Sequence, residues 1–293
     1  MQMRGCRVYY EPYNASQLHL AYCHRVHFRF QTHCRLPQSY LEGLRQDEFQ
    51  ASLDAYGIRL LDVASDEVDL VCQVSLRPAE SVSGCASKFK GRLSKWLRTA
   101  QGLDAPTKLL ATGYLACTVG DPTRKDIEGY IGRQGEHHGY SQRPLPPVLV
   151  EEYPLPAAAA VRLDAAHNLS LLRYHLVFGT MCRRGVFTQA EAAGVVAAWR
   201  GVQAKEQFAL LKVSVVPDHV HMAVRVHPAV APLALAERLM NVAQEVMFEQ
   251  FPEVVIRYSA NRLWENGAYV GSFGELSSRA VRAALAQWRG QGA

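Results

Sequence analysis

Two histidines one residue apart are the first candidates for chemistry in the sequence. His219-Val220-His221 lies in an apolar run rich in β-branched residues, from 213 to 226, which is typical of a strand. Side chains two residues apart project from the same face of a strand, so both imidazoles can bind one divalent cation while Val220 points into the core. Such a pair can hold a metal against a phosphate oxygen. The alternative is a pair of exposed histidines that binds nothing.

The strand that carries these histidines belongs to a pattern that occurs twice in the chain. Identical residues recur in register, and the spacing between the matching segments is similar in both halves, which favours an internal duplication. Chance similarity between two β-rich halves is the alternative. The matching segments are 25–35 with 173–183, 65–71 with 217–223, and, with a slip of one residue, 113–120 with 268–274.

Each half predicts the order β-α-β-β-α-β followed by a terminal helix, which is that of a ferredoxin-like or RRM-like domain. The predicted class is α+β: two tandem domains forming a pseudo-dimer, each an antiparallel sheet with helices on one face. The domains are 1–138 and 169–293, and the proline-rich segment 139–168 between them predicts an extended, partly rigid linker. The predicted strands are 24–32, 58–63, 67–75, 171–179, 208–216, 219–227 and those around Tyr114 and Tyr269; the predicted helices are 38–55, 82–101, 123–136, 188–203, 231–250 and 276–289.

Composition places the chain among globular proteins. Its 293 residues, 48% hydrophobic and 20% charged, suffice for two domain cores. No apolar stretch is long enough to cross a bilayer, and the first residues lack the apolar run of a secretory signal. Seven scattered cysteines, an odd number, indicate reduced thiols rather than a disulfide framework. We therefore expect a cytoplasmic protein with no membrane partner.

The charge distribution indicates a nucleic-acid partner more strongly than the net charge of +5 does. The segment 88–98 holds five basic residues and no acidic one, and we expect it to contact DNA phosphates. Phe89 and Trp96 either stack on bases or are buried in the core, and their helical spacing favours burial. The matching helix of the second half is less basic, so we expect the first domain to hold structured DNA more firmly. The basic residues are Lys88, Lys90, Arg92, Lys95 and Arg98.

Three segments of the second half resemble one family. The segments 173–180, 216–222 and 263–272, above all Pro217-Asp218-His219-Val220-His221, resemble the single-tyrosine transposases of the HUH endonuclease superfamily. That group includes insertion-sequence transposases and REP-associated tyrosine transposases. The resemblance covers 171–289 and, through the repeat, extends more faintly to 24–136. It implies a metal-dependent nuclease that acts on single-stranded DNA.

The resemblance also implies a tyrosine nucleophile on the terminal helix, with a glutamine one turn later as a third metal ligand. In the second half, Ala284 stands at the tyrosine position, whereas the first half has Tyr130 and Gln134, four residues apart on one helix face. The first half in turn has Glu67 and Asp69 at the histidine positions. Carboxylates can bind a hard cation, but we expect these two to form a solvated or hydrogen-bonded degenerate site.

These complementary losses predict one intact site in a fused pseudo-dimer. In the family, active sites are shared between two subunits, so His219 and His221 of one domain would meet Tyr130 and Gln134 of the other. The second site would hold Glu67, Asp69 and Ala284, without a tyrosine. The alternative is that Tyr130 is an ordinary tyrosine of an amphipathic helix and that the protein is inactive.

The implied reaction is transesterification at a phosphodiester. Mg²⁺ or Mn²⁺ on His219, His221 and Gln134 would polarise a phosphate oxygen, and Tyr130 would attack the phosphorus. A 5′-phosphotyrosine intermediate and a free 3′-hydroxyl would result, and a hydroxyl could then rejoin the strand. The implied partner is single-stranded DNA with hairpin structure, and further dimerisation of the chain is open. Two alternatives remain: a domesticated, non-catalytic nucleic-acid-binding protein, and a relaxase- or replication-initiator-like nickase.

Overall fold

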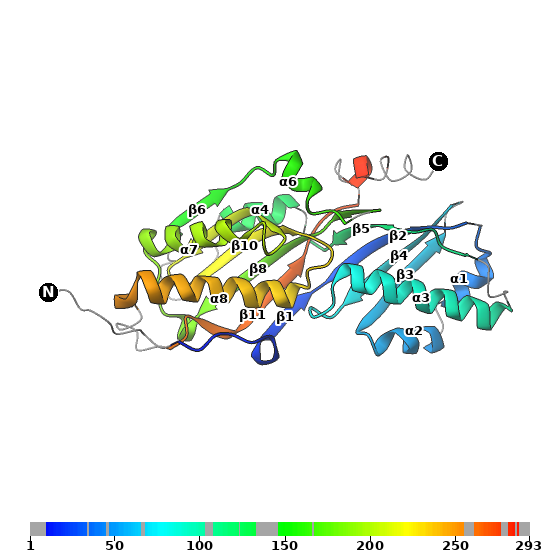
Figure 1. Ribbon diagram of the computed structural model, residues 1–293, viewed down its shortest axis with the longest axis horizontal. Helices are drawn as coiled ribbons and strands as arrows, with labels where there is room; N and C mark the ends of the chain where they lie inside the picture. Colours follow the sequence, from blue (N-terminus) through cyan, green and yellow to red (C-terminus); the bar gives the residue numbers. More distant parts are fainter. Residues whose placement is uncertain are drawn as a thin grey trace.

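Two β-sheets lie end to end along the long axis of the molecule (Figure 1). Two extended segments of the chain cross between them, one in each direction. The computed structural model describes residues 10–33, 35–44, 47–65, 68–102, 108–122, 124–132, 146–165, 167–254, 261–276, 281–284 and 286. None of the helices in these ranges is long and apolar enough to cross a membrane. The five cysteines they contain are free thiols.

The first half of the chain follows the predicted order of elements. In β2 (Arg25–Gln31), every second side chain is buried, which is the strand period that the sequence shows. The Ser81 side chain accepts a hydrogen bond from the Gly84 amide at the start of α3 (Val82–Gln101), and Gly102 ends that helix with φ of 63°. The other elements are α1 (Gln38–Leu44), α2 (Asp47–Asp54), β3 (Ile58–Ser65), β4 (Asp69–Leu76), β5 (Tyr114–Val119) and α4 (Arg124–Gly132).

The second half repeats this order. Thr188 and Glu191 form a capping box at the start of α7 (Gln189–Val202), which fixes the position of that helix. The other elements are β8 (Arg173–Thr180), β9 (Phe208–Val216), β10 (His219–Val226), α8 (Pro232–Gln250), β11 (Trp264–Ser272) and a helical turn at 281–284. Most of the predicted helices and strands lie within a few residues of these bounds. The predicted helix 38–55 is instead two helices, α1 and α2.

The strand order confirms the predicted α+β class. The neighbours run β5-β2-β4-β3 in the first half and β11-β8-β10-β9 in the second, all antiparallel, as in a ferredoxin-like sheet. Each sheet also has a parallel strand that the sequence did not predict. β1 (His19–Cys23) pairs with β11, and β7 (Asn168–Leu171) pairs with β5.

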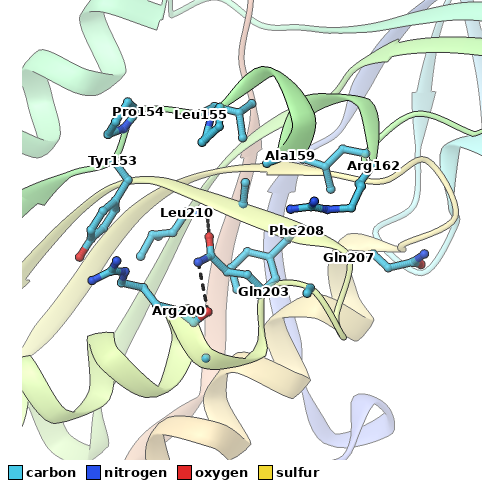
Figure 2. Close-up of a pocket in the computed structure, with 15 residues that line it drawn as sticks. Tyr153, Pro154, Leu155, Ala159, Arg162, Arg200, Gln203, Gln207, Phe208 and Leu210 are labelled. Atoms are coloured by element: carbon cyan, nitrogen blue, oxygen red, sulfur yellow. Dashed lines mark hydrogen bonds between the residues drawn. The ribbon is translucent and has the colours of Figure 1, made fainter.

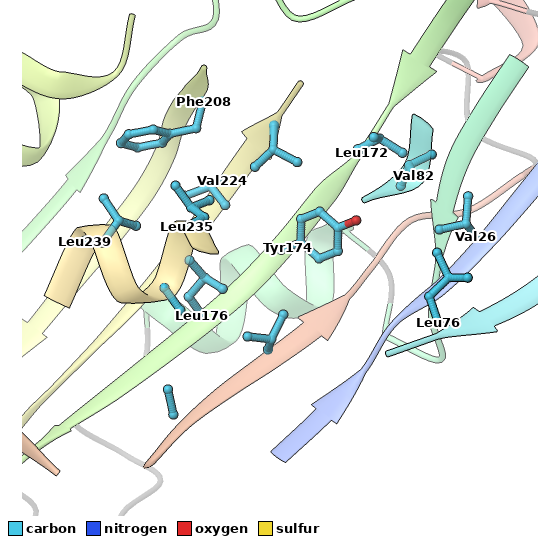
Figure 3. Close-up of a cluster of buried hydrophobic side chains, with 14 of the residues drawn as sticks. Val26, Leu76, Val82, Leu172, Tyr174, Leu176, Phe208, Val224, Leu235 and Leu239 are labelled. Carbon is cyan, nitrogen blue, oxygen red and sulfur yellow. The ribbon is translucent and has the colours of Figure 1, made fainter. Parts of the chain in front are cut away.

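These parallel strands are exchanged between the two halves. Only His24 separates β1 from β2, so one extended segment passes from the C-terminal sheet, which contains β11, into the N-terminal sheet, which contains β5. β7 and β8 make the reverse crossing, with only Leu172 between them. The buried side chains accordingly form one cluster across the two sheets, with Val26 and Leu76 on one side and Leu172 and Tyr174 on the other (Figure 3).

Matching hydrogen bonds join the sheets at this junction. Ser272 Oγ accepts from the Arg25 amide at 2.9 Å and donates to the Val119 carbonyl at 2.7 Å. In the mirrored arrangement, Thr118 Oγ1 accepts from the Arg173 amide at 2.9 Å and donates to the Phe273 carbonyl at 2.8 Å. Each buried hydroxyl thus satisfies two backbone groups across the junction.

The segment predicted as an extended linker contains regular structure. β6 (Leu149–Glu152) pairs antiparallel with β9 and forms the outer strand of the C-terminal sheet, and α6 (Ala157–Val161) follows it. Pairing along β9 covers backbone groups that an edge strand would otherwise expose. Residues 139–145 of this segment lie outside the described part of the chain.

The terminal helices correct the expectation that all helices lie on one face. Ile127 and Ile131 of α4 pack against Leu211, Ala223 and Phe273, on the face of the C-terminal sheet that α7 and α8 leave uncovered. The helical turn at 281–284 packs through Val281 on Leu115 and Cys117 of the N-terminal sheet. Each terminal helix therefore lies on the sheet of the other half.

Candidate active site

The two histidines of β10 share one face of the C-terminal sheet, as the sequence predicts. His219 and His221 are buried, and their ring centroids lie 4.9 Å apart. Val220 between them points to the opposite face and is fully buried in the main core. Strand alternation thus places the two imidazoles together on the face that receives α4.

Asp218 and Arg183 hold the ring of His219. Asp218 Oδ1 lies 2.6 Å from His219 Nδ1, and Arg183 Nη2 lies 3.1 Å from Asp218 Oδ2 and 3.2 Å from the same ring nitrogen. The pKa of the Asp218 carboxyl is lowered, because its bond to His219 and the charge of Arg183 outweigh the effect of burial. A carboxylate on Nδ1 fixes the orientation of the ring and directs Nε2 to the site.

Arg183 lies in a strained turn directly after β8. Cys182 and Arg183 have φ of 55° and 53°, in the left-handed region that non-glycine residues rarely adopt. Each such residue costs on the order of 1–2 kcal/mol, and strain of this kind concentrates at functional sites. The Cys182 amide donates to the Glu265 carboxylate, which holds the turn.

His175 of β8 supports His221 in the same way. His175 Nε2 lies 3.0 Å from His221 Nδ1, and the two rings stack with centroids 5.2 Å apart. Burial lowers the pKa of His175 to about 4, so its ring is neutral at neutral pH. His175 was not among the predicted site residues, although it belongs to the repeated segment 173–183, where its counterpart in the first half is His27.

Tyr130 of α4 reaches this histidine cluster from the other half of the chain. Its ring centroid lies 5.3 Å from that of His221 and 6.0 Å from that of His175, edge to face in both pairs. The side chain is half-buried. The structure therefore brings together Tyr130, His219 and His221, the three described members of the predicted composite site. Gln134, the fourth, lies outside the described residues.

The corresponding position in the N-terminal sheet has a different arrangement. Asp69 is buried and forms an ion pair with Arg29 at 2.9 Å. His27 lies on the same strand face as Arg29, and burial together with the Arg29 charge lowers its pKa to about 4. Ala284 packs beside Leu115 and Cys117, and Glu67 lies outside the described residues. The Asp69 carboxylate is thus paired with an arginine of the neighbouring strand.

The predicted DNA-binding residues of α3 are largely engaged within the protein. Lys88 pairs with Glu80 at 2.7 Å, and Lys90 Nζ donates to the carbonyls of Ala111 and Gly113 at 2.6 and 3.0 Å. Arg92 contacts the Tyr56 hydroxyl, and its guanidinium lies over that ring. Lys95 is exposed and Arg98 is partly buried. Phe89 is buried, as expected, whereas Trp96 is partly buried against the core.

A cavity of about 720 Å³ lies away from the histidines. It is bounded by the segment after β6, the end of α7 and the start of β9 (Figure 2). The Arg200 guanidinium lies over the Tyr153 ring at 4.8 Å, and Gln203 Oε1 accepts from the Leu210 amide at 2.6 Å. Its walls hold none of the three histidines.

Comparisons with known proteins concern the second half of the chain. Residues 168–285 match the model of the family described as "Transposase IS200 like". Over 114 residues, the chain is 24% identical to the transposases for insertion sequence element IS200 of Salmonella typhimurium and Salmonella typhi, covering 39% of this chain and 75% of each relative. A candidate transposase of known structure from Deinococcus radiodurans is 24% identical, with a TM-score of 0.32, over 41% of this chain and 89% of that one.

The matched region contains β8 and β10 with all three histidines of the cluster, and it ends one residue after Ala284. It does not include Tyr130, which comes from the first half. The second half of the chain, residues 168–285, therefore matches the IS200-like transposase family, and it carries the histidine pair.

Proposed function

We propose that this protein is a transposase-type endonuclease and strand-transferase that cuts single-stranded DNA with Tyr130 as its nucleophile. The observation that carries the proposal is the edge-to-face contact of Tyr130 with His221, a residue 91 positions further along the chain, at 5.3 Å between ring centroids. The family match of residues 168–285 supports a DNA-processing reaction. A nucleophile beside a pair of candidate metal ligands suits phosphodiester transesterification.

The histidine pair fits a divalent cation. Asp218 and His175 orient the two rings through Nδ1, and in this proposal Nε2 of each ring binds the cation. Among the described residues, no group of three or more His, Cys, Asp or Glu side chains could hold a metal. In this proposal the third ligand is Gln134, which lies outside the described residues. The cation proposed for this site is Mg²⁺ or Mn²⁺. When bound, the cation would polarise a non-bridging phosphate oxygen.

In this proposal Tyr130 forms the covalent bond. Its hydroxyl oxygen bonds to the phosphorus while the bond from phosphorus to the 3′-oxygen of the neighbouring nucleotide breaks. The phenol loses its proton, the leaving 3′-oxygen gains one, and a 5′-phosphotyrosine and a 3′-hydroxyl remain. α4 holds the ring next to the cluster through Ile127 and Ile131, so the phenol does not have to be ordered during the reaction. The attack of a 3′-hydroxyl on the tyrosyl ester reverses the step and joins strands without an external energy source.

The same proposal treats the chain as two fused copies of one transposase domain. Its support is the common strand order, the exchange of β1 and β7, and the matching Ser272 and Thr118 bonds at the junction. The chain would then have one complete site, because Asp69 is paired with Arg29 and Ala284 stands where the other copy has Tyr130. Such a protein holds one cleaved end per chain.

A covalent-adduct assay tests the proposal. The protein is incubated with single-stranded DNA, with and without a hairpin, in the presence of Mn²⁺, and separated on a denaturing gel. The wild type and the control Tyr40→Phe, in α1, should give a protein–DNA band, whereas Tyr130→Phe should give none. His219→Ala should also lose Mn²⁺ binding by calorimetry. A Tyr130→Phe variant that still forms the adduct would overturn the assignment.

The same assay separates the alternatives. A domesticated binding protein retains single-stranded DNA in a native gel but forms no adduct with any of the probes. A relaxase- or replication-initiator-like nickase forms the adduct on DNA from a replication or transfer origin rather than on the flanks of its own gene. The match to the IS200-like family favours the transposase over both.

A further inference from the structure

We propose that Tyr269 is a stacking platform for a nucleobase of the DNA strand, next to the phosphate that Tyr130 attacks; this inference rests on the proposed function. Tyr269 is one of the few large apolar side chains that the described part of the chain exposes, at 38%. It pairs with Val177 across β11 and β8, so it lies on the same sheet face as His175, two residues earlier. Its ring centroid lies 5.8 Å from that of His175.

The ring of Tyr269 lies across Gly271. A Cβ atom at Gly271 would lie 2.5 Å from the Tyr269 hydroxyl oxygen and 2.8 Å from its Cε1. Gly271 is the residue paired with His175, so the sheet surface beside the cluster holds the tyrosine ring in place of a side chain. One side of the ring therefore rests on the strand, while more than a third of the side chain remains open to solvent.

Tyr130 and Tyr269 both approach His175, one from the helix above the sheet and one from the strand. The ring centroids lie 6.0 and 5.8 Å from that of His175, and both pairs are edge to face, at 76° and 69°. A DNA strand with a phosphate at Tyr130 would therefore place the neighbouring base at Tyr269. Every base has an aromatic face, so this contact suits single-stranded DNA of any sequence.

The surroundings of Tyr269 support stacking over nucleophilic attack. Burial raises the pKa of its phenol, and the nearby Cys23 and Asp121 raise it further. The phenol therefore stays protonated at neutral pH, which keeps the ring as a neutral surface.

Binding of single-stranded DNA to variants in a Tyr130→Phe background tests the inference without chemistry. Tyr269→Ala should bind about tenfold to a hundredfold more weakly, the usual effect of removing an aromatic partner of one base. Tyr269→Phe should restore most of the affinity, because the ring is kept. Gly271→Ala, which keeps the tyrosine but places a methyl group where the ring lies, should weaken binding as well. Thermal unfolding shows whether each variant is folded.

The matched control is Tyr22→Ala. Tyr22 is 46% exposed on β1, but it pairs with Val270, whose side chain is buried on the face of the sheet away from Tyr269 and the histidines. Replacing Tyr22 should therefore leave the affinity for DNA unchanged. DNA with a single abasic site locates the stacked base. When the abasic site is at that base, the Tyr130→Phe parent and its Tyr269→Ala variant should bind the DNA equally. Equal binding of Tyr269→Ala and its parent on intact DNA overturns the inference. A parent that binds no single-stranded DNA overturns the proposed function instead.

Discussion

At the scale of residues, the site consists of histidines that other side chains orient. Asp218 and His175 each bind the Nδ1 atom of one member of the pair, at 2.6 and 3.0 Å. The pairing of His219 and His221 could be predicted, because a period of two follows from strand geometry alone. The role of His175 could not, because its partner His221 lies 46 positions away and only the antiparallel register of β8 and β10 brings the rings together.

The carboxylate of Asp218 should control the affinity of the site for metal. Asp218→Ala leaves His219 without the acceptor that fixes its ring, so Mn²⁺ affinity should fall about tenfold to a hundredfold, as is usual for partners of metal-binding histidines. Calorimetric titration with Mn²⁺ measures this directly. Asp54→Ala, at the end of α2, serves as the control. Unchanged affinity in Asp218→Ala would mean that the carboxylate does not orient His219.

The basic residues of α3 show a limit of prediction at this scale. Their spacing on the helix could be predicted, but not that Lys90 would turn toward the carbonyls of Ala111 and Gly113 or that Arg92 would lie on Tyr56. Those partners come from the loop before β5 and from the turn after α2, which approach the helix only in the folded chain. A lysine that donates to two backbone carbonyls is less available to a phosphate.

At the scale of elements, α4 and the helical turn at 281–284 occupy equivalent places on the two sheets. Ile127 and Val281 are both buried, one on the C-terminal sheet and one on the N-terminal sheet. Only α4 carries a tyrosine next to the histidines. The helix around Tyr130 could be predicted from its periodicity, and the contact of Tyr130 with His221 could be predicted from the family resemblance. The exchange of β1 could not be predicted, because its five residues show no regular alternation of burial and pair with residues 248 positions further along the chain.

Substitutions that create a cavity beneath each of these two elements should have different effects on the reaction. Ile127→Ala loosens α4 and should slow adduct formation per folded molecule, at a stability cost of about 2–5 kcal/mol. Val281→Ala should also lower stability, since its side chain is buried, but it should leave the rate unchanged. Initial rates of adduct formation, measured well below both unfolding temperatures, make the comparison. Equal rates in the two variants would contradict the role given to α4.

At the scale of the whole molecule, the two sheets form one body because strands and hydroxyl groups cross the junction. The backbones approach so closely there that a Cβ atom at Gly120 would lie 2.2 Å from the Ser272 carbonyl oxygen. His24 lies between β1 and β2 and is fully buried, with Nε2 2.9 Å from the Tyr174 hydroxyl. The repeat predicted two similar domains. It could not predict that their sheets would share strands and buried contacts, because these contacts join residues that are distant in sequence.

Adding a methyl group at the junction should destabilise the protein. Gly120→Ala forces Ser272 and its neighbours to move, at a cost of about 1–3 kcal/mol, because the obstructing atom belongs to the backbone. Gly91→Ala is the control: no atom lies within 4 Å of its Cβ position on α3, and alanine should stabilise that helix by about 0.5–1 kcal/mol. Urea unfolding gives both values. A destabilisation of similar size at both glycines would contradict the close approach at the junction.

Acid should weaken the fold through His24. Burial lowers the pKa of His24 to about 4, whereas a histidine in the unfolded chain titrates near about 6.5. The unfolded chain therefore binds more protons between these pH values, and stability falls as the pH drops from about 6.5 to about 4. The difference amounts to about 3 kcal/mol for this residue.

Urea unfolding at pH 7 and pH 4.5 should show this loss. The double variant His24→Leu/Tyr174→Phe removes both members of the buried pair, so it should lose correspondingly less stability between the two pH values than the wild type does. An identical pH dependence in the two proteins would assign the acid sensitivity to other groups.

Mass spectrometry of the DNA-linked peptide tests the central claim most directly. The wild-type adduct with single-stranded DNA and Mn²⁺ is digested with protease and nuclease, and the residue that carries the remaining nucleotide is sequenced. The nucleotide should be found on Tyr130, from the first half of a chain whose second half supplies His219 and His221. A nucleotide on Tyr269, or on any residue other than Tyr130, would contradict the account.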